Sequence, residues 1–135
     1  MEEKEITKKL DLSKKEDLSI AVIHLINAED HLAFTAMKTK KEEYLKVLDS
    51  VRNLRKRLMK KLVSNTEGEM WCTSKHLLAA TMRLLETGEK CIGNDDKEAN
   101  DMLKDAFDVY TLFWFLQKFG EKYDVKRTGK ESKKI

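Results

Sequence analysis

SKKE at residues 13–16, TKKE at 39–42, TEGE at 66–69 and DDKE at 95–98 repeat one pattern along the chain. In each, a Ser, Thr or Asp precedes a Glu by three residues, just ahead of an apolar run with helical spacing. This is the capping-box pattern, in which the first side chain accepts a hydrogen bond from a free backbone N–H at a helix start and the Glu reaches back. The four segments predict four helix starts, 26 to 29 residues apart.

The composition agrees with an all-helical chain. Its 135 residues suit one domain with one core, and they include no Pro and only five Gly, so helices can run without interruption. We therefore predict an antiparallel up-down-up-down four-helix bundle over residues 13–120, with a flexible segment at 1–12 and a disordered basic tail at 121–135. The expected helices span 14–37, 40–63, 67–91 and 96–119.

The charge and cysteine content of the chain indicate its cellular compartment. Charged residues make up 38% of the chain, Lys and Glu are abundant and Gln occurs once, a composition typical of thermophile proteins. The first ten residues are charged and lack the apolar core of a secretory signal. Cys72 and Cys91 lie far apart on one expected helix, so they cannot pair with each other. These features favour a cytoplasmic protein with free thiols.

Apolar residues exceed what a single four-helix core needs. The helix expected at 14–37 carries a second apolar stripe opposite its core stripe. The helix expected at 96–119 has Phe107 on its core face, and its last residues are apolar on all sides. Monomers seldom expose large contiguous apolar patches, so we expect a homodimer or a protein partner there. The alternative is that residues 1–12 or a skewed bundle cover this surface. The expected interface residues are Ile23, Phe34, Leu112, Phe115 and Phe119.

Charged residues also fall on expected core stripes. Glu29 lies in the middle of the stripe of the first helix, Arg55 lies in that of the second, and Arg52 lies at its edge. A charge that faces a core needs a partner, and antiparallel packing brings Glu29 within reach of Arg52 and Arg55. The predicted group is a structural ion pair that fixes helix register, or else an anchor for a small ligand.

No catalytic or metal motif accompanies these charges. His24, His31 and His76 lack the Glu-x-x-His spacing of helical di-metal sites, and His24 and His31 are seven residues apart, too far to share a metal within one helix. Cys72 and His76 are four residues apart, but no third catalytic group can be named. We therefore expect neither an enzyme nor a bound cofactor or metal.

One basic run supports a different function. Between residues 52 and 61 there are six Lys or Arg and no acid, and the tail from 121 carries the whole net charge of +3. Such a surface could bind nucleic acid or another polyanion, but the favoured interpretation is complementary charge with the acidic start of the last helix, within the bundle or between subunits. The polyanion-binding candidates are Arg52, Lys56, Arg57, Lys60, Lys61, Lys126 and Arg127.

The sequence thus predicts a homo-oligomeric interaction or scaffold module. Polyanion binding is the first alternative. The second is a small-molecule or metal site in a polar core around Glu29, Arg52 and Arg55, possibly with His24 or His31. A membrane role is not expected, because the longest uncharged apolar stretch is too short to cross a bilayer.

Overall fold

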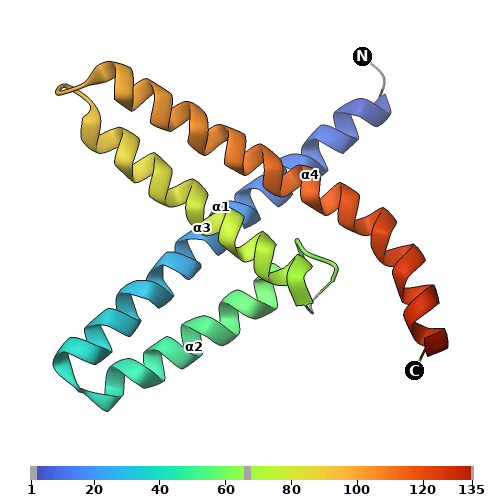
Figure 1. Cartoon of the computed structure of the whole chain (residues 1–135), viewed down its shortest axis with the longest axis horizontal. Helices are drawn as coiled ribbons and strands as arrows, with labels where there is room; N and C mark the ends of the chain where they lie inside the picture. The colour runs from blue at the N-terminus through green and yellow to red at the C-terminus, as the bar shows by residue number, and fades with distance from the viewer. Residues whose placement is uncertain (1–2, 66–67, 135) are drawn as a thin grey trace. The chain divides into compact units, whose positions relative to one another are not determined.

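The computed structural model consists of four helices (Figure 1). It describes residues 3–65 and 68–134, with side chains at 14–65 and 68–119, and within these ranges it contains no strand. The helices are α1 (Glu3–Thr39), α2 (Glu42–Met59), α3 (Gly68–Cys91) and α4 (Asp96–Lys134). The all-α prediction is confirmed.

The chain divides into two compact units, Met1–Leu62 and Val63–Ile135. The first unit is a hairpin in which α1 and α2 pack together, and the second is a hairpin of α3 and α4 (Figure 1). Within each hairpin a short turn reverses the chain, so the two helices are antiparallel neighbours. The closure of both hairpins into one four-helix bundle stays a prediction.

The turn of the first hairpin differs from the predicted cap. Lys40, the residue after the end of α1, adopts a positive φ of 57°, and its N–H still donates to the Ala36 carbonyl at 2.8 Å. Thr39 was expected to cap α2, but its hydroxyl donates back to Thr35 at 2.8 Å, and the cap position belongs to Lys41, which makes no side-chain cap bond. The capping prediction at Thr39 is wrong because Thr39 lies two residues before the cap position. Its hydroxyl donates to its own helix and accepts from the N–H of Lys41 at 3.4 Å, not from the first N–H groups of α2.

The turn of the second hairpin follows the prediction. Gly93 adopts a φ of 88° beyond the end of α3, which its missing Cβ permits. Asp95 caps α4, since its Oδ1 accepts from the backbone N–H of Glu98 at 3.1 Å. Asp96 adds a second link by accepting from the N–H of Gly93 at 2.8 Å. Thr66, the remaining expected cap, lies outside the described residues.

Three helix ends differ from the expected ones. The helix of α1 begins at Glu3 and passes through Ser13, so Ser13 is not a cap, and α4 continues beyond Phe119 to Lys134. Lys and Glu are good helix formers and the chain has no Pro. The helices therefore continue through Ser13, where a start was expected, and through Gly120, where an end was expected. At the other boundary α2 ends at Met59, four residues early. The expected disorder of 1–12 and 121–135 stays a prediction.

The second hairpin packs closely along small residues. Ser74, Thr81 and Gly88 of α3 are buried at seven-residue spacing, and so are Ala99, Ala106 and Phe113 of α4 (Ala99 5%, Ala106 0% and Phe113 0% exposed). A Cβ on Gly88 would lie 3.2 Å from the Ala99 carbonyl oxygen and 3.0 Å from the Leu103 side chain. Because antiparallel helices advance in opposite directions, this contact also sets Thr81 near Ala106 and Ser74 near Phe113. We call these six residues the second seam.

We expect Gly88→Val to destabilise the protein by more than about 2 kcal/mol, because the new side chain meets backbone as well as Leu103. Glu89→Val, at the exposed neighbouring position, is the matched control and should cost only about 0.5 kcal/mol of helix propensity. Urea unfolding followed by circular dichroism measures both. Equal losses for the two variants would show that α3 and α4 do not approach closely at Gly88.

Candidate functional site

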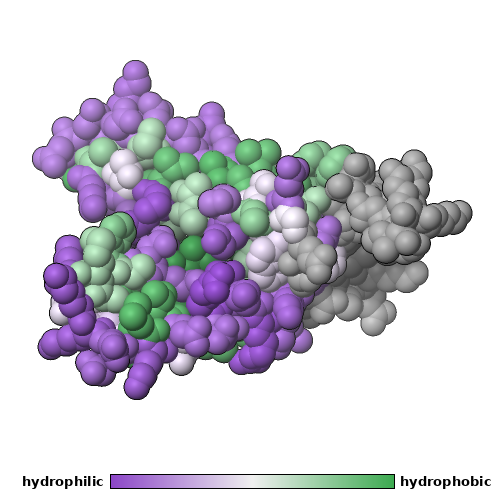
Figure 2. Space-filling view, turned by 60° about the horizontal axis from the view of Figure 1, so that its bottom comes forward, coloured by the Kyte–Doolittle hydropathy of each residue, from purple (hydrophilic) through white to green (hydrophobic). Residues whose placement is uncertain are grey.

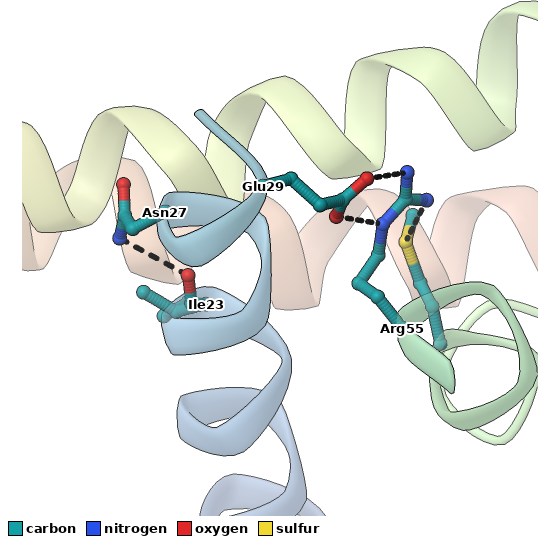
Figure 3. A network of polar contacts seen from close by, with 5 residues as sticks. Ile23, Asn27, Glu29 and Arg55 are labelled. Atoms are coloured by element: carbon teal, nitrogen blue, oxygen red, sulfur yellow. Dashed lines mark hydrogen bonds and ion pairs between the residues drawn. The ribbon is translucent and has the colours of Figure 1, made fainter. Parts of the chain in front are cut away.

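A bidentate ion pair between Glu29 and Arg55 joins the helices of the first hairpin (Figure 3). The guanidinium of Arg55 donates to the two carboxylate oxygens of Glu29, from Nε at 2.7 Å and from Nη2 at 2.9 Å. Its Nη1 lies 3.9 Å from the sulfur of Met59. The side chains are only 3% and 12% exposed, so the pair is largely withdrawn from water. Two parallel bonds to one carboxylate fix the relative direction of both groups.

The pair lies at the midpoint of a line of buried and half-buried residues, which we call the first seam. Val22 and Ala36 are buried seven residues on either side of Glu29, and Leu48 and Leu62 lie seven residues on either side of Arg55. A shift of α2 along α1 by seven residues would place the charges of Glu29 and Arg55 against apolar residues. Since an unpaired buried charge is costly, the ion pair favours one register over its neighbours.

The other predicted members of this polar group lie elsewhere. Arg52 is exposed, so the arginine that pairs with Glu29 is Arg55. His24 and His31 are exposed as well, while Asn27 is buried and donates to the Ile23 carbonyl at 3.0 Å. Among the described residues no three His, Cys, Asp or Glu side chains gather as metal ligands would. Among the described residues, the Glu29–Arg55 pair is therefore not part of such a metal-binding group.

A smaller polar contact lies in the second hairpin. Gln117, the only glutamine of the chain, donates to the hydroxyl of buried Ser74 at 2.8 Å and to the Phe113 carbonyl at 3.2 Å. The neighbouring indole N–H of Trp114 is buried without a hydrogen-bond partner, and its ring meets Phe113 edge-on with centroids 5.0 Å apart. These groups link α3 to α4 and present no reactive set.

Exposed phenylalanines are the most unusual surface feature. Of the five in the chain, four expose more than half of their surface: Phe34 60%, Phe107 68%, Phe115 66% and Phe119 54%. Leu112 is 53% exposed. Figure 2 shows hydrophobic residues reaching the surface between hydrophilic ones. Four of the five predicted interface residues are thus exposed in the single chain.

Two positions differ from the sequence-based expectation. Ile23, predicted for the interface, is only 4% exposed, so it offers no free surface. Phe107, expected on the core face of the last helix, is exposed because Ala106 takes that place in the second seam and one residue turns the helix by about 100°. The seven-residue spacing of Ala99, Ala106 and Phe113 was the signal that could have excluded Phe107 from the core.

The basic run is open to solvent. Arg52, Arg57, Lys60 and Lys61 are exposed and Lys56 is half-buried, whereas Lys126 and Arg127 lie where side chains are not described. The acidic residues at the start of α4 are exposed too. Among the described side chains, the salt bridge is that of Glu29 with Arg55.

Comparison with known proteins gives no family, no curated relative and no similar solved structure. Over the described residues, no helix combines the length and the apolar character that crossing a membrane requires. The case for a function therefore depends on the surfaces just described.

We expect Arg55→Met to destabilise the protein by about 3–5 kcal/mol, because it leaves the carboxylate of Glu29 buried without its partner. The double variant Glu29→Leu with Arg55→Met should regain most of this loss, since two apolar groups need no compensation. Arg52→Met, on the exposed side of the same helix, is the control and should stay within about 0.5 kcal/mol of the parent. Equal unfolding free energies for Arg55→Met and Arg52→Met in urea titrations would contradict the assignment.

Proposed function

We propose that this protein is a homo-oligomeric interaction module that uses exposed aromatic residues of α1 and α4 as its contact surface. The observation that carries the proposal is the exposure of four of its five phenylalanines. Burying a large apolar side chain is worth about 1.5–3 kcal/mol, so a monomer forgoes a considerable stabilisation at these positions. Aromatic residues are also enriched in protein interfaces.

The same proposal includes closure of the two hairpins into an up-down-up-down four-helix bundle. A single hairpin has one seam to bury, which is a small core for a stable unit. We place the protein in the cytoplasm, with support from its free cysteines, Cys72 and Cys91. No group of the described residues argues for catalysis, so the proposed role is assembly.

Polyanion binding is the second candidate, because the Lys and Arg side chains of residues 52–61 are exposed to solvent, apart from Arg55 and half-buried Lys56. Nucleic acid would be the probe, since several phosphates neutralised together give steep salt dependence. This function predicts purified material that absorbs in excess at 260 nm and loses that excess as salt rises. The first candidate predicts no such excess.

For the interaction module we expect light scattering after size-exclusion chromatography to give at least twice the chain mass at micromolar concentration. Replacing Phe34 and Phe115 together by Ser should weaken association about tenfold or more, because each substitution removes an exposed ring that the proposed interface would bury. Ile92→Ser is the control, since Ile92 is 60% exposed but lies in the turn between α3 and α4. A parent chain that stays monomeric at tens of micromolar would contradict the proposal.

A further inference from the structure

The outer face of α4 carries its own pattern, separate from the second seam. Phe113 faces α3, and Phe115, two residues on, is turned about 200° away from it. Residues on this side follow one another at spacings of three and four, as in a coiled coil. Those with described side chains, all exposed, are Asp105, Asp108, Leu112, Phe115 and Phe119.

The same spacing continues in the sequence beyond Phe119. Since α4 is helical to Lys134, the next two positions on this line belong to Lys122 and Lys126. We call the seven residues from Asp105 to Lys126 the α4 outer line. It reads acidic, then apolar, then basic along the helix.

This order is complementary to itself when the direction is reversed. If two copies of α4 pack antiparallel about a two-fold axis near residues 113–117, the apolar centres meet each other. The acids of each copy then lie opposite the bases of the other, twice by symmetry. A parallel arrangement would instead set acid against acid and base against base, which is unfavourable.

We propose that the α4 outer line is the site where a second copy of this chain binds, with its α4 antiparallel to the first. This proposal rests on the proposed function and specifies the interface that carries it. The occupant is a second copy because the charges of the line match their own reversed order. Exposure of Phe115 and Phe119 supplies the apolar centre, while the flanking charges select the direction.

Charge reversal tests the direction directly. The acid-reversed variant combines Asp105→Lys with Asp108→Lys, and the base-reversed variant combines Lys122→Glu with Lys126→Glu. Each should weaken the dimer about tenfold or more at low salt, because like charges then oppose each other across the axis. The variant that carries all four changes restores opposite charges in an antiparallel pair only, so it should return to within about threefold of the parent dissociation constant.

Sedimentation equilibrium gives the dissociation constants, and circular dichroism shows that each variant keeps its helix content. The control, Glu69→Lys with Glu89→Lys, makes the same charge change at exposed positions of α3 and should leave the dimer intact. A dimer that resists both reversals, or that fails to return in the four-site variant, overturns the α4 site and leaves the interaction module standing. A parent chain without self-association overturns both.

Discussion

Seven-residue spacing is the constraint on which both hairpins depend. An antiparallel helix pair covers positions that recur every seven residues, and each hairpin contains such a set. In the first hairpin it is Val22, Glu29 and Ala36 against Leu48, Arg55 and Leu62, and in the second it is the small residues of α3 against Ala99, Ala106 and Phe113. The two seams set their register by different means. The first uses a buried ion pair at its midpoint, and the second uses close backbone approach at Gly88. In both, the fixed register decides which residues remain on the outside.

Sequence patterns predicted the parts of this structure that depend on local chemistry. Asp95 and Gly93 mark the turn between α3 and α4, where cap and glycine act within a few residues. The positions of Glu29 and Arg55 on their apolar stripes predicted that a charge on each helix would meet an opposite charge. The sequence left the choice between Arg52 and Arg55 open, because the two arginines are about one helical turn apart and both long side chains could reach Glu29. Thr39 and Phe107 were misplaced because a hydroxyl can bond to its own helix and because a neighbouring alanine can occupy the core instead.

The candidate functional surface follows from what the seams leave over. Once Ala106 and Phe113 face α3, the rings of Phe107 and Phe115 must point elsewhere, and the sequence analysis predicted this for Phe115 but not for Phe107. The outer line of α4 then offers the same spacing as the two internal seams, with charges ordered for an antiparallel copy. In this account, the protein assembles by repeating between chains the packing that it uses within each hairpin.

The most direct test of this account is the distance between identical spin labels on the two copies, measured by pulsed electron paramagnetic resonance. Cys72 and Cys91 would first be replaced by Ser, and one label at a time would be placed at exposed positions of α4 that are not part of the outer line, such as Lys97, Lys104 and Thr111. Antiparallel pairing predicts the shortest distance at Thr111 and a steady increase of about 3 Å for each residue moved toward the start of α4, twice the rise per residue. Distances that stay constant along the helix would contradict it.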